Sequence, residues 1–228
     1  MKLSINPETD ALLVIDIQND FIPGGNLSVA GGAEIIDGVA ELAKQFKTVV
    51  LSQDWHPENH ASFASSHPGA APFSEIKAYY GPQTLWPDHC VQGTAGADFH
   101  PDLYGTGVVQ SAALIVRKGI NSMIDSYSAF FENDGKTSTG LAGALRDRGI
   151  TRVFCVGLAY DFCVGFSALD AKQVGFEAVV VKDLTRAIAA PANGDETTAD
   201  VMDSRLLAAS VIVADQADVT LRRNAFKA

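Results

Sequence analysis

Residues 153–171, VFCVGLAYDFCVGFSALDA, decide the fold. The segment opens with an apolar run, residues 153–156, which is typical of a strand buried on both faces of a parallel sheet. A short turn follows at 157–161. Beyond the turn, small and apolar residues recur at helical spacing, which predicts a helix over residues 164–174. A strand, a turn and a helix in this order form the repeating unit of α/β proteins.

The same alternation runs through most of the chain, and it predicts a parallel sheet with helices on both faces. We therefore expect an α/β protein with a three-layer α/β/α architecture and a six-stranded, mainly parallel sheet. No shift in composition marks a boundary, so we expect a single domain over residues 1–228. The predicted strands are 11–17, 48–52, 114–117, 153–156, 178–181 and 211–214, and the predicted helices are 33–46, 139–148, 164–174, 197–209 and 218–226.

Composition excludes several classes of protein. The formal net charge is −10 and no basic run is present, which argues against a nucleic-acid partner. No apolar run approaches the roughly 18 residues of a membrane span, so we expect no membrane partner. The N-terminal segment is polar and unlike a secretory signal. The chain has three cysteines at irregular spacing, which suits a reducing compartment better than a disulfide framework. We expect a cytoplasmic protein.

Cys163 falls where the helix after the turn begins. A thiol there meets the positive end of the helix dipole and free backbone N–H groups, and both favour the nucleophilic thiolate. The alternative is that Cys163 is a small buried apolar residue, as free cysteines often are. The local sequence leaves both interpretations open.

Two other polar residues lie at the ends of predicted strands. Asp16 interrupts the apolar run of the first strand, and Lys118 ends the third. Taken alone, Asp16 could cap a loop and Lys118 could be solvated. However, the carboxyl ends of parallel strands meet at one edge of a sheet. Asp16, Lys118 and Cys163 then form a candidate catalytic set, in which a carboxylate accepts the thiol proton and an ammonium stabilises negative charge.

A second set of candidate residues follows the second predicted strand. Asp54 and His56 are two residues apart, which puts both side chains on one face of an extended segment. His89, in a distant loop, could complete a site of three N and O ligands for a divalent transition metal. His60 and Ser62 are candidates for a fourth ligand, directly or through water. The alternative is that these groups only form hydrogen bonds within a long loop, residues 54–112.

Aromatic residues flank both sets in the sequence. Phe21 lies just past Asp16, Trp86 just before His89, and Tyr127 shortly after Lys118. Ordinary loop packing would explain them. A flat slot that holds a planar ring is the functional alternative.

Six segments in order resemble the nicotinamidases, which belong to the isochorismatase-like cysteine hydrolases. The resemblance runs from about residue 11 to the last predicted strand, and no catalytic position departs from the family pattern. The segments are LLVIDIQNDFIPGGNLSV (12–29), SQDWHPENHASF (52–63), LWPDHCVQGTAGADFH (85–100), VRKGINSMIDSYSAFFEN (116–133), TGLAGALRDRGI (139–150) and GLAYDFCV (157–164).

The resemblance assigns roles to the candidate residues. It implies that Asp16, Lys118 and Cys163 are the catalytic triad. It implies metal ligation by Asp54, His56 and His89, with Ser62 or His60 near a variable fourth position. Phe21 and Trp86 would hold a pyridine ring. The remaining implied features are Tyr127 and Leu158 at the substrate, a cis Leu158–Ala159 peptide, and an oxyanion hole formed by the backbone N–H groups of Ala159 and Cys163.

The expected activity is metal-dependent deamidation of nicotinamide to nicotinate and ammonia, in NAD salvage, through a thioester on Cys163. Pyrazinamide is a further expected substrate. One divalent ion is expected, with zinc ahead of iron and manganese, and a homo-oligomer is an expected assembly. The alternatives are an amidohydrolase acting on carbamoyl or maleamate-like substrates, a metallohydrolase in which Cys163 only packs, and a binding protein without activity.

Overall fold

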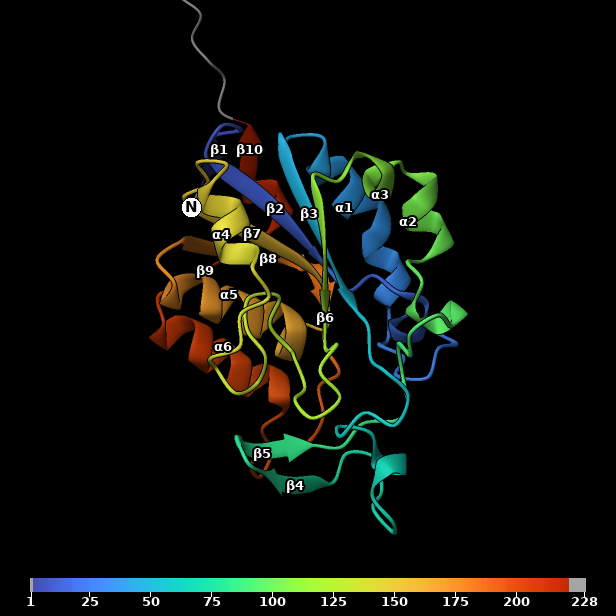
Figure 1. Ribbon diagram of the computed structural model, residues 1–228. Helices are drawn as coiled ribbons and strands as arrows, with labels where there is room; N and C mark the ends of the chain where they lie inside the picture. Colours follow the sequence, from blue (N-terminus) through green and yellow to red (C-terminus); the bar gives the residue numbers. More distant parts are fainter. Residues whose placement is uncertain (1, 222–228) are drawn as a thin grey trace, which may run out of the picture.

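A parallel sheet of six strands forms the centre of the computed structural model, which describes residues 2–221 (Figure 1). All five pairings within this sheet are parallel, as the alternation of strands and helices predicts. Across the sheet, the order is β6 (Leu114–Lys118), β3 (Thr48–Asp54), β2 (Asp10–Ile15), β7 (Arg152–Leu158), β8 (Glu177–Arg186) and β9 (Ile212–Ala214).

Both faces of the sheet are covered, and the central strand β2 shows why its sequence is apolar throughout. Successive side chains of a strand point to opposite faces. Leu12 and Val14 pack into one core cluster, whereas Ala11, Leu13 and Ile15 pack into the other. Every residue of β2 is buried, so a continuous apolar run is needed where a one-sided sheet would show alternation.

Within residues 2–221, three helices cover each face (Figure 1). The amphipathic pattern predicts four of them but misses the two short ones at residues 101–105 and 108–111. On one face lie α1 (Ile36–Ala43), α2 (Pro101–Gly105) and α3 (Val108–Ser111), and on the other lie α4 (Leu141–Arg146), α5 (Gly165–Gln173) and α6 (Thr198–Ala208).

The predicted helix over residues 218–226 is wrong in its described part. Val219–Leu221 forms strand β10, which pairs in parallel with β1 (Leu3–Ile5). Val219 is buried in the core cluster under α1, and this pairing outweighs the weak helical pattern. Residues 222–228 of the prediction lie outside the described residues.

A small antiparallel hairpin projects beyond the carboxyl ends of the sheet strands, at the bottom of Figure 1. It consists of β4 (Glu75–Ala78) and β5 (Gly81–Thr84), inside the long segment that the sequence leaves without periodicity. The hairpin therefore stands on the side of the sheet where sites form in open α/β folds.

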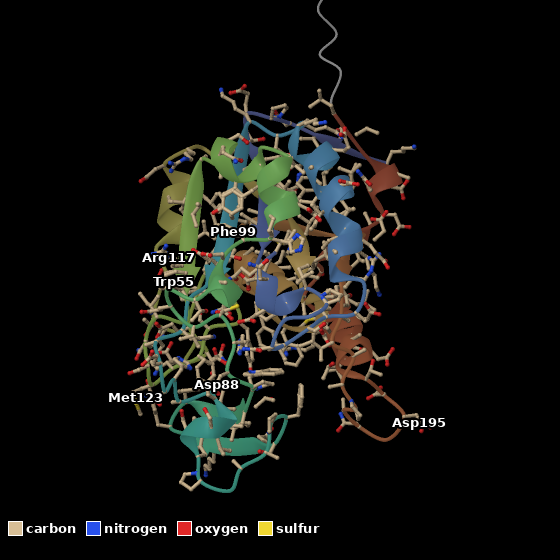
Figure 2. The ribbon with its side chains drawn as sticks, turned by 90° about the vertical axis from the view of Figure 1, so that its right-hand side faces the viewer. Trp55, Asp88, Phe99, Arg117, Met123 and Asp195 are labelled. Carbon is tan, nitrogen blue, oxygen red and sulfur yellow. The ribbon has the colours of Figure 1, made fainter. Side chains whose placement is uncertain are left out.

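The edge strand β6 is shielded at its carboxyl end. Figure 2 shows Arg117 beside Trp55, and the guanidinium carbon lies 4.0 Å from the indole centroid. Arg117 also donates a hydrogen bond to Gln53 Oε1 at 3.1 Å.

Within residues 2–221, no helix has both the length and the apolar character needed to cross a membrane.

Candidate active site

Asp16 follows the last residue of β2 and is fully buried. Its backbone adopts φ 47°, a conformation that few residues other than glycine adopt, which turns the chain sharply at the end of the strand. Ser52 Oγ donates a hydrogen bond of 2.7 Å to Oδ1 of Asp16. The second oxygen, Oδ2, faces Lys118 Nζ at 2.9 Å but receives no hydrogen bond of regular geometry from the described residues. That oxygen can therefore accept a proton.

Lys118 ends β6, and its ammonium group joins the other members of the predicted triad. Nζ lies 2.9 Å from Asp16 Oδ2, 3.1 Å from Asp54 Oδ1 and 3.5 Å from Cys163 Sγ. It also donates to the backbone oxygen of Ser126 at 2.9 Å. The structure thus brings Asp16, Lys118 and Cys163 together, from three different strand ends.

Cys163 lies in a π-helical turn, Tyr160–Val164, that leads from β7 into α5. The wide turn is closed by a hydrogen bond of 3.1 Å from Val164 N to Ala159 O, five residues back. Such π-turns are frequent at functional sites. The Leu158–Ala159 peptide bond is cis, as expected.

Strands β7 and β2 approach each other closely just before this turn. At Gly157, φ is 110° and an added Cβ would come within 2.1 Å of Ile15 O. Any larger residue would push β7 away from β2 at the point where Asp16 and the Cys163 turn begin.

Burial and charge determine the protonation of the triad. Burial raises the pKa of the Cys163 thiol well above its usual value, although Lys118 acts in the opposite direction. Burial also raises the pKa of Asp16, again against Lys118. Burial lowers the pKa of Lys118, but Asp16 and Asp54 outweigh it and hold that pKa well above its usual value. The start of the helix therefore does not maintain a thiolate on its own, and the resting pair is an ammonium and a thiol.

Asp54, His56 and His89 also come together, with the ligand atoms of all three within 4.8 Å of one another. Asp54 Oδ2 lies 3.1 Å from His56 Nε2 and 3.4 Å from His89 Nε2. The other ring nitrogens, Nδ1, lie 3.0 Å from Gly119 O and 2.8 Å from Pro87 O. A carbonyl oxygen only accepts, so each Nδ1 carries a proton and each ring turns its Nε2 towards the carboxylate.

With both Nε2 atoms unprotonated, three acceptors converge in a buried space, an arrangement that a shared cation satisfies. Two imidazoles and a carboxylate suit a divalent transition metal, so these residues fit the expected ion. Burial raises the pKa of Asp54, but His56 and Lys118 outweigh it and hold that pKa well below its usual value. Asp54 is therefore charged and available as a ligand.

His60 and Ser62 are placed differently from the three central donors. His60 Nδ1 lies 2.8 Å from Ser62 Oγ, and His60 Nε2 lies 2.8 Å from Asn121 O. Both ring nitrogens are thus engaged away from Asp54. His60 does share a second group of converging donors with His56 and Asp125. A role for His60 or Ser62 as fourth ligand stays a prediction.

A pocket opens above Cys163, and aromatic side chains form its walls. Phe21 packs edge-on against His89 at 5.5 Å, and Trp86 packs edge-on against Phe162 at 4.8 Å, both measured between ring centroids. Leu158, which we expected at the substrate, is buried in the core and does not line the pocket. The lining residues are Phe21, Leu27, Asp54, Trp86, His89, Asp125, Tyr127, Ala159, Phe162, Cys163 and Ile188.

Sequence reasoning missed several contributors to the site. Phe162 precedes Cys163 in the chain, and this adjacency could have indicated it. Asp125 is a buried carboxylate in a segment without periodicity. Gln18 is fully buried and holds Asp54 in place, because its Oε1 accepts from Asp54 N at 2.7 Å and its Nε2 donates to Asp54 O at 2.8 Å. Nothing in the local sequence distinguishes Gln18 from a loop residue.

The Isochorismatase domain model matches residues 10–204. The chain belongs to the isochorismatase family. Within this family it is 54% identical, over 178 residues, to a nicotinamidase of Acinetobacter baylyi, covering 78% of this chain and 81% of the relative.

Solved structures of the isochorismatase family share the fold. A nicotinamidase and pyrazinamidase of Acinetobacter baumanii superposes with a TM-score of 0.88 and 47% identity, covering 94% of this chain and 99% of that one. PnC1 of L. infantum, solved in complex with nicotinate, has a TM-score of 0.82, 39% identity and coverages of 97% and 100%. A pyrazinamidase of Pyrococcus horikoshii in complex with zinc has a TM-score of 0.71, 33% identity and coverages of 92% and 99%.

Proposed function

We propose that the protein hydrolyses nicotinamide to nicotinate and ammonia, with Cys163 as the nucleophile. The observation that carries this proposal is the position of Cys163 Sγ, 3.5 Å from Lys118 Nζ, at the base of a pocket walled by Phe21, Trp86 and Phe162. Relatives named nicotinamidases and a relative solved with nicotinate support the choice of substrate. Pyrazinamide, a ring of similar size, is a second substrate, in keeping with the pyrazinamidase relatives.

Binding places the carboxamide over the thiol. The pyridine ring lies in the aromatic slot between Phe21 and Trp86, and Tyr127 forms a further wall. Cys163 lines the pocket together with Asp54 and His89, so the ring nitrogen can point to the Asp54, His56 and His89 cluster while the carboxamide meets Cys163. This orientation supplies the proximity that a slow amide cleavage needs.

The first half of the reaction forms a thioester. Asp16 takes the thiol proton through Oδ2, and the resulting thiolate attacks the carboxamide carbon. Backbone N–H groups of Ala159 and Cys163 hold the developing oxyanion, and Lys118 stabilises the charge beside them. The carbon–nitrogen bond then breaks, and Asp16 returns its proton to the leaving ammonia.

The second half releases nicotinate. A water molecule takes the place of ammonia, Asp16 accepts one of its protons, and the oxygen adds to the thioester carbon. The carbon–sulfur bond breaks, and the proton on Asp16 restores the thiol. Nicotinic acid leaves and gives its proton to solvent.

Asp54, His56 and His89 would hold one divalent ion, and zinc is our first choice because it accepts this ligand set. When bound, the ion supplies a Lewis acid that attracts and orients the ring nitrogen. The zinc complex of a pyrazinamidase relative supports this choice. Elemental analysis of the isolated protein separates zinc from iron and manganese.

Ammonia release from nicotinamide tests the proposal. We expect turnover by the wild-type protein and a loss of at least about 1,000-fold in Cys163→Ala, because the nucleophile is gone. Cys155→Ala is the matched control, since Cys155 is equally buried but lies in β7, where burial raises its pKa to about 12. Mass spectrometry of the quenched reaction should find a thioester on Cys163. Near-normal ammonia release by Cys163→Ala would refute the mechanism and favour a metallohydrolase.

A further inference from the structure

Gln83, on the hairpin strand β5, is almost completely buried and has every polar atom engaged. Its Nε2 lies 2.7 Å from Thr84 O, 3.0 Å from Asp125 Oδ2 and 3.1 Å from the Tyr127 hydroxyl, and these three acceptors share the two protons of the amide. Its Oε1 accepts from the Tyr80 hydroxyl at 3.0 Å. The carboxylate of Asp125 only accepts, so it fixes which end of the amide is Nε2. A buried amide held on both sides has one orientation.

Asn133 completes the attachment from the opposite side. Asn133 Nδ2 donates to Gln83 Oε1 at 3.1 Å, and Asn133 Oδ1 accepts from the backbone N of Tyr127 at 3.0 Å. Tyr127 is therefore held at both ends, by Gln83 at the hydroxyl and by Asn133 at the backbone. These contacts tie the hairpin to the segment between β6 and α4.

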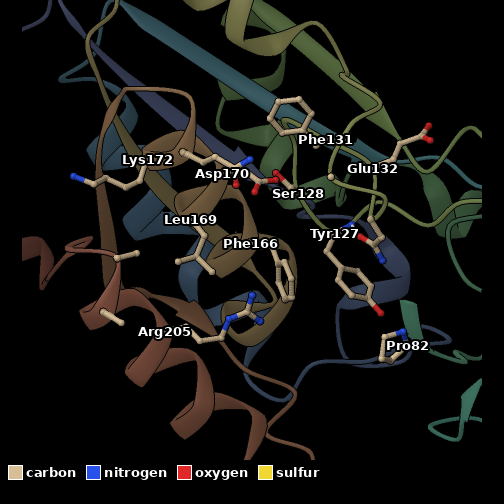
Figure 3. A pocket seen from close by; sticks show the side chains of 15 residues that line it. Pro82, Tyr127, Ser128, Phe131, Glu132, Phe166, Leu169, Asp170, Lys172 and Arg205 are labelled. Carbon is tan, nitrogen blue, oxygen red and sulfur yellow. Dashed lines mark hydrogen bonds between the residues drawn. The ribbon is translucent and has the colours of Figure 1, made fainter. Parts of the chain in front are cut away.

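Tyr127 in turn holds Trp86, which forms one wall of the aromatic slot. Its hydroxyl also accepts a hydrogen bond of 3.2 Å from Trp86 Nε1, the single donor of the indole ring. Figure 3 shows the Tyr127 hydroxyl directed towards Pro82, the neighbour of Gln83, while Phe166 lies on the other side of the ring. The Tyr127 and Phe166 centroids are 5.2 Å apart, so the ring is also fixed laterally.

We propose that Gln83 is a positioning residue that sets the orientation of Tyr127 and, through it, Trp86, and thereby the affinity of the slot for the pyridine ring. The inference rests on the proposed function of the slot. Gln83 does not line the pocket, and no member of the triad is among its hydrogen-bond partners, which are Tyr80, Thr84, Asp125, Tyr127 and Asn133. It therefore acts on ring binding and leaves the chemical steps unchanged.

Gln83→Met keeps the length of the side chain and removes both hydrogen-bonding ends. We expect the KM for nicotinamide and the dissociation constant of nicotinate to rise about tenfold, as the loss of one buried hydrogen bond implies, with kcat within about twofold of wild type. Gln110→Met is the matched control, because Gln110 lies exposed in α3 and its Nε2 donates to Tyr104 O. Its kinetic constants should stay at wild-type values.

A double-mutant cycle separates positioning from general loosening. If Gln83 acts through the Tyr127 hydroxyl, Tyr127→Phe should raise KM by a similar factor, and Gln83→Met combined with Tyr127→Phe should be no worse than Tyr127→Phe alone. Gln83→Glu, which keeps the shape but loses the Nε2 donor, should reproduce the KM effect if Gln83→Met does not fold. Additive effects, an unchanged KM, or an equal fall in kcat would overturn the inference.

Nicotinate binding keeps this test separate from the test of function. If the wild-type protein binds nicotinate but releases no ammonia, the proposed function fails, while the comparison of dissociation constants still decides the role of Gln83. If the wild type binds no pyridine ligand, both proposals are refuted. If ammonia release is normal and Gln83→Met binds nicotinate as wild type does, only the role of Gln83 is refuted.

Discussion

At the residue scale, the hydroxyl of Ser52 affects the protonation of Asp16. Ser52 Oγ donates to Asp16 Oδ1 at 2.7 Å, and this hydrogen bond favours the charged carboxylate, whereas burial raises its pKa. In the proposed mechanism, the carboxylate is the form that accepts the thiol proton. We therefore expect Ser52 to extend the activity of the site to lower pH.

Ser52→Ala should move the acid limb of the kcat/KM profile to higher pH. Without the hydroxyl, the pKa of Asp16 rises further, so a larger share of Asp16 is protonated and inactive at a given acidic pH. The profile is measured by ammonia release from nicotinamide. Ser111→Ala, the same change on α3, should leave the limb in place. An unmoved limb in Ser52→Ala would show that Asp16 does not set it.

Gly119→Ala should weaken metal binding. An added Cβ would come within 2.4 Å of His56 Cε1, and φ at this residue is 65°, so His56 or the backbone must shift. Gly119 O also orients His56 through Nδ1, and the loss of such a partner typically costs about 10- to 100-fold in metal affinity. Competition with a chromogenic chelator measures the affinity. Gly105→Ala is the control, since a Cβ there meets open space, and equal affinities in both variants would contradict the role of Gly119.

At the scale of elements, the sequence predicts the parts of the fold that repeat. All six sheet strands contain the predicted apolar runs, and their ends lie close to those observed except in β8, which continues to Arg186 beyond the predicted 178–181. The triad, Asp54 and His56 come together because they lie at or just beyond strand ends, a rule that needs no knowledge of tertiary contacts. His89 instead comes from a distant loop.

The hairpin β4–β5 and the helices α2 and α3 were not predicted, for different reasons. The strands EIKA and GPQT have only four residues each, and GPQT shows no apolar alternation, so the sequence signal is weak and the buried side chain of Gln83 helps to hold the hairpin. Helices α2 and α3 are too short for a helical period to emerge. Gln18 and Asp125 can be recognised as residues of the site only from their neighbours in the folded structure. Single-domain organisation and oligomeric state stay predictions.

Helix α6 begins with a capping box, which leads to a stability prediction. Thr197 Oγ accepts from Asp200 N, and the Asp200 carboxylate accepts from Thr197 N at 2.9 Å. Thr197→Ala should lower the free energy of unfolding by about 1 kcal/mol, because the first turn of the helix loses its cap. Urea denaturation measures the change. Thr151→Ala, an exposed threonine outside any cap, should stay within about 0.5 kcal/mol of wild type, and equal losses would contradict the prediction.

At the scale of the whole molecule, the three metal donors link two distant parts of the chain. Asp54 ends β3 and His56 lies just beyond it, whereas His89 comes from the segment after the hairpin. An ion held by all three should stabilise the folded chain, because the unfolded chain cannot bring them together.

Removal of the ion with a chelator should lower the melting temperature by about 5–10 °C, and added zinc should restore it. Differential scanning calorimetry measures the shift. His89→Ala should melt at a temperature that no longer responds to zinc, because one of the three donors is missing. A wild-type melting temperature that is the same with and without chelator would rule out a bound ion of this strength.

The pairing of β1 with β10 has a mechanical consequence. The two strands run in parallel, with Leu3 beside Val219 and Ile5 beside Leu221. A force that pulls on Leu3 and Leu221 in opposite directions acts along the strands, so all rungs of this short ladder carry the load together and must break at once. The ladder lies at the end of the molecule opposite the hairpin (Figure 1). Tension along the chain would thus load the paired strands β1 and β10 first, far from the pocket above Cys163.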